Sequence, residues 1–199
     1  MAVETEIKVS LASTGVVREQ LAPLGCSLLS SRHFEDNYLL DFADGRLKER
    51  MLLLRVRLVG GKAWLTYKGP PRPEGIFKVR EELEISVEDG SVALRILENL
   101  DLRVWFRYQK YREEYAVPVP GESGQEIHLA LDETPIGTYA EFEGAEEAIR
   151  ATASALGFDE SKFVRASYYS LYLQYCGSRG EVAGHMVFPG GEIAKNLAV

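Results

Sequence analysis

Charged residues spaced two apart, with apolar residues between them, recur along this chain and constrain its fold more than any other feature. Side chains two apart on a β-strand point to the same face of its sheet, so each pair directs its charges together. The intervening residues are largely apolar and need cover from other elements. The sequence therefore predicts strands that face one another around a charged lumen, a closed sheet with helices packed outside it. The pattern recurs at Glu4-Thr5-Glu6-Ile7-Lys8, Arg55-Val56-Arg57, Arg80-Glu81-Glu82-Leu83-Glu84, Lys110-Tyr111-Arg112 and Glu141-Phe142-Glu143.

Hydrophobic periodicity predicts an α+β chain in which strands outnumber helices. A Gly60-Gly61 turn marks the clearest hairpin, and Ser161 is the expected N-cap of the last helix. We expect one domain over residues 1–176 and a C-terminal tail without periodicity over 177–199. The expected strands are 2–10, one or two strands within 27–41, and then 52–58, 62–68, 77–87, 104–117, 126–132 and 139–143. The expected helices are 14–24, 90–100, 145–156 and 161–175.

Composition limits the classes of partner. The chain has 199 residues, 46% of them hydrophobic, which is enough for one domain with a substantial core. Its net charge of −7 argues against binding of a nucleic acid polymer, because no basic excess is available to neutralise phosphates. The sequence contains no apolar run of membrane-spanning length, so no membrane partner is expected. Two cysteines, Cys26 and Cys176, are too few for a metal knuckle and fit a reducing compartment, so a cytoplasmic location is expected.

The predicted lumen would contain two sets of charged groups. Converging cations repel unless they meet a polyanion, and Arg and Lys make charge-assisted bonds to phosphate oxygens. Clustered carboxylates repel unless they hold a hard cation such as Mg²⁺ or Mn²⁺. The combination predicts a metal–polyphosphate complex, with ordinary cross-strand ion pairs as the alternative. The cations are Lys8, Arg55, Arg57, Lys68, Arg80, Lys110 and Arg112, and the anions are Glu4, Glu6, Glu82, Glu84, Asp132, Glu141 and Glu143.

Glu4-x-Glu6-x-Lys8 resembles the signature of the CYTH superfamily, the triphosphate tunnel metalloenzymes. That family includes class IV adenylyl cyclases, thiamine triphosphatases and inorganic triphosphatases. The resemblance covers roughly residues 2–175, because later segments resemble further family motifs in the family's order. These segments are Leu54-Arg55-Val56-Arg57, Leu65-Thr66-Tyr67-Lys68-Gly69-Pro70, Arg80-Glu81-Glu82-Leu83-Glu84, Lys110-Tyr111-Arg112, Leu131-Asp132-Glu133 with Gly137, Glu141 and Glu143 after it, and Ser167-Tyr168.

The resemblance implies an eight-stranded antiparallel tunnel that binds a linear triphosphate with one or two divalent ions, Mg²⁺ or Mn²⁺. It implies that Glu82, Glu84 and Asp132 bind a second ion or orient water, and we assign them and Lys8 to catalysis. The implied metal ligands are Glu4, Glu6, Glu141 and Glu143. With Arg80 added from the lumen pattern, the expected substrate-binding residues are Lys8, Arg55, Arg57, Lys68, Arg80, Lys110 and Arg112.

The function we favour from the sequence is metal-dependent hydrolysis of a triphosphate, inorganic or organic. The first alternative is a class IV adenylyl cyclase, which converts ATP to cyclic AMP and pyrophosphate, and the second is a polyphosphate- or nucleotide-binding module without turnover. We expect phosphate release from inorganic triphosphate to exceed cyclic AMP formation, because no purine pocket is evident in the sequence. The organic group and the oligomeric state stay open, with a homodimer among the alternatives.

Overall fold

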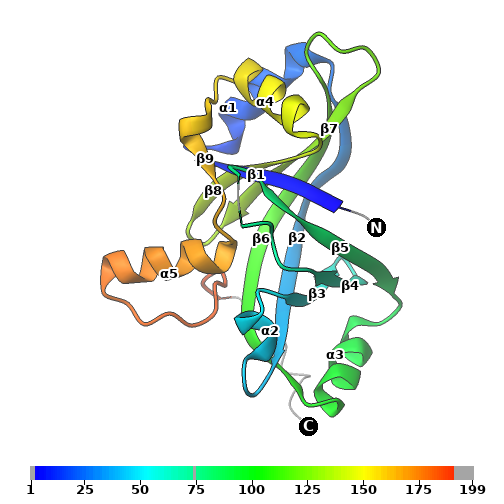
Figure 1. Ribbon diagram of the computed structural model, residues 1–199, viewed down its shortest axis with the longest axis vertical. Helices are drawn as coiled ribbons and strands as arrows, with labels where there is room; N and C mark the ends of the chain where they lie inside the picture. The colour runs from blue at the N-terminus through cyan, green and yellow to red at the C-terminus, as the bar shows by residue number, and fades with distance from the viewer. Residues whose placement is uncertain (1–2, 74, 191–199) are drawn as a thin grey trace.

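Nine antiparallel strands and five α-helices make up the fold in the computed structural model, which describes residues 3–73 and 75–190. Figure 1 shows the strands crossing the centre of the molecule with the helices outside them. The strands are β1 (Val3–Leu11), β2 (Ser27–Phe42), β3 (Leu53–Val59), β4 (Lys62–Lys68), β5 (Lys78–Val87), β6 (Leu102–Pro118), β7 (Glu126–Thr134), β8 (Gly137–Glu143) and β9 (Phe163–Val164). The helices are α1 (Thr14–Leu21), α2 (Arg46–Glu49), α3 (Gly90–Asn99), α4 (Glu146–Ala155) and α5 (Tyr168–Arg179), with short 3₁₀ turns at Ala22–Leu24 and Glu160–Lys162.

Eight of the strands close into a barrel, as the sequence predicts. Hydrogen bonding runs in the order β5-β4-β3-β2-β6-β7-β8-β1, and β1 also pairs with β5. The closing ladder is short, from Val3 opposite Glu81 to Glu6 opposite Lys78. Alternation along each strand then divides the residues between a polar lumen and an apolar outer face.

Apolar clusters on the outside of the barrel hold the helices. Val17 of α1 and Ile149 of α4 are buried in one cluster with Phe142 of β8. At the other end of the barrel, Leu94 of α3 is buried beside Val56 of β3. Figure 1 shows α1 and α4 together at one end and α3 at the opposite end. Helices α1, α3 and α4 thus cover the outer face, and the charged side chains lie in the lumen.

The expected helix over residues 161–175 is wrong in its first half. Ser161 lies in a 3₁₀ turn whose N-cap is Asp159, and the next residues form β9. Val164 of β9 pairs with Lys8 of β1, so a strand partner available only in the folded chain overrides the helical periodicity. The N-cap of α5 is Ser167, whose side chain accepts a hydrogen bond from the backbone N–H of Ser170 at 3.1 Å.

The segment after α5 returns to the barrel. Gly180 ends α5 in the left-handed conformation, with a φ of 69°. Met186 is buried, and its backbone exchanges hydrogen bonds with Arg107 and Gln109 of β6 at 3.0 and 2.9 Å. This part of β6 has no pairing with β7, which begins opposite Tyr111. The final part of the expected tail, 191–199, lies outside the described residues.

Candidate active site

One cavity of about 830 Å³ occupies the lumen of the barrel. Its volume falls within the range of roughly 300–1,000 Å³ typical of small-molecule sites. The strands bring together every sequence-predicted site residue on its wall except Asp132. The predicted residues that line it are Glu4, Glu6, Lys8, Arg55, Arg57, Lys68, Arg80, Glu82, Glu84, Lys110, Arg112, Glu141 and Glu143.

The two Glu-x-Glu pairs lie on neighbouring strands although they are far apart in the sequence. In the β1–β8 ladder, Glu6 stands opposite Glu143 and Lys8 opposite Glu141. All four of these side chains line the cavity, together with Glu4. The expectation that the two pairs share one face of the sheet is therefore confirmed, while their role as metal ligands stays a prediction.

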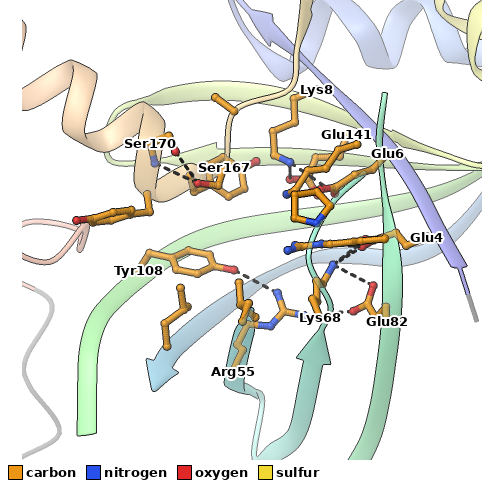
Figure 2. A pocket seen from close by; sticks show the side chains of 18 of the residues that line it. Glu4, Glu6, Lys8, Arg55, Lys68, Glu82, Tyr108, Glu141, Ser167 and Ser170 are labelled. Atoms are coloured by element: carbon orange, nitrogen blue, oxygen red, sulfur yellow. Dashed lines mark hydrogen bonds and ion pairs between the residues drawn. The ribbon is translucent and has the colours of Figure 1, made fainter. Parts of the chain in front are cut away.

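Lysines hold several of these carboxylates. The Lys68 ammonium group donates to both oxygens of Glu4 at 2.7 Å (Figure 2). Lys78 donates to Glu6 at 2.7 Å, and Lys8 lies 3.1 Å from Glu141. Cross-strand ion pairs thus exist inside the lumen, where most of the charged atoms are shielded from water.

Carboxylates that crowd together have perturbed pKa values. Burial, together with the charges of Glu6 and Glu82, raises the pKa of Glu4 to about 7. The pKa of Glu143 is also raised, by burial and by Glu82 and Glu6. Burial alone would raise the pKa of Glu6 as well, but Lys8, Lys78 and Lys68 outweigh it and lower that pKa.

This donor set is chemically suited to Mg²⁺ or Mn²⁺. Glu4, Glu6 and Glu143 supply oxygen ligands, and a divalent cation would relieve the mutual repulsion that raises the pKa of Glu4 and Glu143. In residues 3–73 and 75–190, no three acidic, His or Cys side chains already surround one point. Lys68 and Lys78 would have to move away from the carboxylates for a metal to bind.

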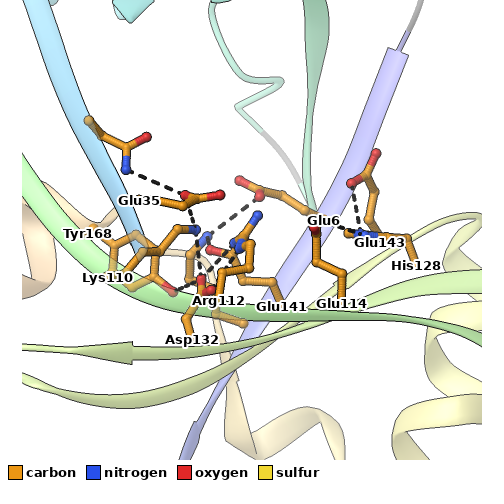
Figure 3. Close-up of polar contacts among 12 residues, drawn as sticks. Glu6, Glu35, Lys110, Arg112, Glu114, His128, Asp132, Glu141, Glu143 and Tyr168 are labelled. Carbon is orange, nitrogen blue, oxygen red and sulfur yellow. Dashed lines mark hydrogen bonds and ion pairs between the residues drawn. The ribbon is translucent and has the colours of Figure 1, made fainter. Parts of the chain in front are cut away.

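A second cluster surrounds Asp132, behind the cavity wall (Figure 3). Asp132 is fully buried and accepts hydrogen bonds from Lys110 at 2.9 Å and from Arg112 at 2.6 and 2.7 Å. The Tyr168 hydroxyl of α5 donates to it at 2.6 Å. Arg112 also bonds Glu141. With its oxygens taken up by these donors, Asp132 is placed to orient Lys110 and Arg112 and does not line the cavity.

The arginines of the opposite wall retain unused donors. Arg57 donates to Glu84 at 2.8 Å, and Arg55 donates to the Tyr108 hydroxyl at 3.2 Å. Within the described part of the chain, the buried Nε atoms of Arg55, Arg57 and Arg80 have no hydrogen-bond partner. The three guanidinium groups line the cavity, but their Nε atoms are shielded, so a ligand in the cavity would meet the terminal nitrogens first.

Several polar residues of the lumen were not predicted from the sequence. Lys78 extends the alternation that continues through Arg80, Glu82 and Glu84, so the period of two could have identified it. His128 lies on the cavity wall, with its Nε2 3.2 Å from a carboxylate oxygen of Glu114. It is four residues before Asp132 on β7, so the two side chains share a face of the strand. Glu35 is buried 3.5 Å from Lys110, but its strand carries no paired charges that would have marked it.

The family follows from a comparison with known proteins. The model of the CYTH domain matches residues 2–167 of this chain. The chain belongs to the CYTH family. Its order of motifs and its closed eight-stranded barrel agree with that assignment. The match ends at Ser167, so all of α5 and the segment that returns to β6 lie beyond it.

Similar proteins have been named for two activities. A Methanocaldococcus jannaschii protein, provisionally named an adenylate cyclase, is 29% identical over 174 residues, which cover 85% of this chain and 98% of the relative. A Vibrio parahaemolyticus structure with the same provisional name has a TM-score of 0.72 at 19% identity, over 84% of this chain and 96% of its own. A Hippeastrum structure described as revealing a dominant triphosphatase activity has a TM-score of 0.62 at 19% identity, over 90% of this chain and 97% of its own.

Among the described residues, every helix is too short or too polar to cross a membrane.

Proposed function

We propose that this CYTH protein is a metal-dependent triphosphatase that hydrolyses a terminal phosphoanhydride bond inside the barrel. The observation that carries the proposal is the set of cations, among them Arg55, Arg57 and Arg80, that lines one cavity inside the barrel. Phosphate oxygens accept several hydrogen bonds each and match guanidinium donors in geometry. The Hippeastrum structure supports the proposal to the extent that the same fold carries a triphosphatase activity.

The basic residues of both walls would bind the phosphate chain. Arg55 and Arg57 stand on β3, and Lys110 and Arg112 stand on β6, all lining the same cavity. Asp132 holds Lys110 and Arg112 in place from behind, so that neither cation must be ordered when the phosphates arrive. Charge that develops on the transferred phosphoryl group would be stabilised by these fixed cations.

The carboxylates of β1 and β8 would hold the metal. Glu4, Glu6, Glu141 and Glu143 supply the oxygen donors. A bound divalent ion supplies Lewis-acid stabilisation of phosphate charge. Lys68 and Lys78, freed from Glu4 and Glu6, would then be available to phosphate oxygens.

Glu82 and Glu84 of β5 would orient the attacking water. Both line the cavity, and Glu84 is fixed by the Thr66 hydroxyl at 2.6 Å and by Arg57 at 2.8 Å. Lys68 lies 2.9 Å from Glu82. Burial would raise the pKa of Glu82, but Lys68 lowers it, so Glu82 stays ionised and acts by accepting a hydrogen bond from water.

Adenylyl cyclase activity is the second candidate, because the Methanocaldococcus jannaschii relative carries that name. The same cations and carboxylates would serve this reaction. It differs in the nucleophile, a ribose hydroxyl in place of water, and in the phosphorus attacked, which is the α-phosphorus of ATP, so that pyrophosphate leaves and cyclic AMP forms.

A substrate panel with resolved products tests the proposal. Inorganic triphosphate, ATP and thiamine triphosphate are incubated with Mg²⁺, with Mn²⁺ and with EDTA, and phosphate, pyrophosphate and cyclic AMP are quantified. We expect phosphate from every substrate that is hydrolysed, with an equal amount of pyrophosphate from inorganic triphosphate, more phosphate than cyclic AMP from ATP, and no turnover in EDTA. Glu6→Gln is expected to abolish turnover while circular dichroism stays unchanged, and the exposed Glu126→Gln serves as control. Cyclic AMP as the main product from ATP, or turnover that persists in EDTA, would overturn the proposal.

A further inference from the structure

Four of the cations proposed to bind phosphate form two pairs, one on β3 and one on β6, with β2 between these strands. Glu84 of β5 contacts both cations of the β3 pair, at 2.8 and 3.4 Å. Asp132 of β7 contacts both cations of the β6 pair, at 2.6 and 2.9 Å. Each pair thus has an acid of its own. The β3 pair is Arg55 and Arg57, and the β6 pair is Lys110 and Arg112.

Glu35 of β2 is the acid that the two pairs share. It stands opposite Lys110 in the β2–β6 ladder, and one of its oxygens lies 3.5 Å from that ammonium group. Its other oxygen accepts a hydrogen bond from Arg57 at 3.3 Å. Among the acids of residues 3–73 and 75–190, it alone forms ion pairs with members of both pairs. Figure 3 shows Glu35 on one side of Lys110 and Asp132 on the other.

Glu35 acts from behind the cavity wall. It is 1% exposed, and it is not among the described residues that line the cavity. His33 of the same strand lies 3.6 Å from its carboxylate, and Asn37 donates a hydrogen bond to it at 3.5 Å. A buried charge is little screened by water or salt. The carboxylate therefore lowers the positive potential that Arg57 and Lys110 present to a phosphate chain.

We infer that Glu35 is a positioning residue that limits the affinity of these cations for polyphosphate. It acts through Arg57 and Lys110, which it keeps partly neutralised while the phosphates lie in the cavity. The inference rests on the proposed function, because the two cations must contact phosphate for their charge balance to affect binding. Cations that bind substrate and product equally tightly slow product release and do not accelerate the chemical step, so a limit on their affinity favours turnover.

A purely structural ion pair would have the opposite effect on binding. If Glu35 only held the two cations in place, its loss would disorder them and weaken the binding of phosphate. If its charge limits the affinity, its loss tightens binding, because a buried negative charge close to the phosphates is removed. The direction of the change in affinity therefore separates the two roles.

Dissociation constants of inorganic triphosphate and pyrophosphate test the inference. They are measured by isothermal titration in EDTA for wild type, Glu35→Gln and Glu35→Asp, so that no metal contributes. We expect Glu35→Gln to bind both anions at least about 10-fold more tightly, and Glu35→Asp, which keeps the charge, to stay within about 3-fold of wild type. Glu113→Gln is the matched control, because Glu113 of β6 pairs with Arg18 at 2.6 Å and is not among the described residues that line the cavity.

Turnover of inorganic triphosphate in Mg²⁺ provides a second measurement. Tighter binding of substrate and product predicts that Glu35→Gln lowers both KM and kcat, each by about 3-fold or more. Loss of a purely structural contact would instead raise KM.

Unchanged or weaker binding of triphosphate by folded Glu35→Gln would overturn the inference and leave the proposed function standing. If Glu35→Gln is unfolded without ligand, saturating triphosphate is expected to restore the fold, because its charge replaces that of the missing carboxylate. Failure to restore the fold would also count against the inference.

The proposed function is decided separately. Wild type that binds triphosphate but does not hydrolyse it would end the proposed function, while the titration in EDTA still decides the inference. If neither wild type nor Glu35→Gln binds triphosphate in EDTA, the inference is wrong, and turnover in Mg²⁺ alone decides the proposed function.

Discussion

Some charged side chains of this lumen have ion-pair partners and still keep an unpaired donor atom or a perturbed pKa. Arg57 reaches Glu84 at 2.8 Å and Glu35 at 3.3 Å through its terminal nitrogens, while its Nε remains without a partner in the described structure. Glu4 is held by Lys68 but lies close enough to Glu6 and Glu82 for its pKa to reach about 7. Both features belong to single side chains, and each leads to a test by substitution.

Arg57→Lys is expected to weaken triphosphate binding about 10-fold, because an ammonium group cannot reproduce the planar set of guanidinium donors. Isothermal titration with inorganic triphosphate measures the change. Arg32→Lys is the matched control, since Arg32 is paired with Glu133 at 2.8 Å and is 45% exposed outside the cavity. Equal affinities for wild type and Arg57→Lys would show that Arg57 does not contact phosphate.

The raised pKa of Glu4 predicts a pH-dependent stability of the metal-free protein. A folded-state pKa of about 7, above the ordinary 4.5, means that the folded chain favours neutral Glu4. This contribution to the free energy of unfolding is fully present below pH 4.5 and is lost as the pH rises through about 7. Glu4→Gln is therefore expected to gain stability relative to wild type between pH 5 and pH 8, as measured by urea unfolding in EDTA.

Saturating Mg²⁺ should reverse that trend for wild type, because the ion binds the ionised carboxylate and so favours the folded state at high pH. A stability difference between wild type and Glu4→Gln that is constant across this range would contradict the raised pKa. A wild-type protein indifferent to Mg²⁺ at pH 8 would remove Glu4 from the proposed metal site.

At the scale of elements, α5 connects the cavity to the outer face of the barrel. Its first turn places Tyr168 against Asp132, and Tyr172 donates to the His185 carbonyl at 3.2 Å in the segment that returns to β6. Met186 then pairs with the edge of β6 that β7 leaves free. The first two turns of the helix are thus held on both sides, which fixes the side chains that it presents to the cavity.

Ser167→Ala is expected to lower the free energy of unfolding by about 1 kcal/mol, because the hydroxyl that caps the Ser170 N–H is lost. Ser161→Ala is the matched control and should change stability by less than about 0.5 kcal/mol, since Ser161 is exposed and caps no helix. Chemical denaturation of both variants provides the comparison. A larger effect at Ser161 would favour the helix start that the sequence predicted.

For the whole molecule, the barrel concentrates charge in a space shielded from water and is closed by only a short ladder between β1 and β5. The crowding of charge affects Lys78, because burial and the neighbouring Lys8 and Arg80 lower its pKa to about 8. A ligand of opposite charge that binds only the folded barrel would stabilise the entire fold.

Metal and triphosphate together are expected to raise the melting temperature by about 5–10 °C. Ligand at 100 times its dissociation constant contributes about 2.7 kcal/mol, and each kcal/mol corresponds to roughly 2–4 °C for a domain of this size. Scanning calorimetry measures the shift, with sulfate at equal ionic strength as the control. A shift no larger than that caused by sulfate would contradict a site for polyphosphate in the lumen.

Much of this arrangement could be predicted from local sequence. The two-residue alternation at Glu4-x-Glu6-x-Lys8 and Arg55-x-Arg57 identifies which side chains share a face, because strand geometry fixes that period. The closed barrel and the family membership agree with those predictions. The metal, the reaction, the cytoplasmic location and the oligomeric state stay predictions.

Other features depend on contacts between residues distant in the sequence. Phe163 and Val164 form a strand because they pair with β1. Asp132 does not line the cavity, because the Tyr168 hydroxyl of α5 donates a hydrogen bond to it. Met51, Trp105 and Tyr169 line the cavity together although they share no local motif. The sequence determined the charges and the face on which each lies, since backbone geometry sets these locally. Only the tertiary structure decided which of them meet, since closure of the barrel brings strands from both ends of the chain together.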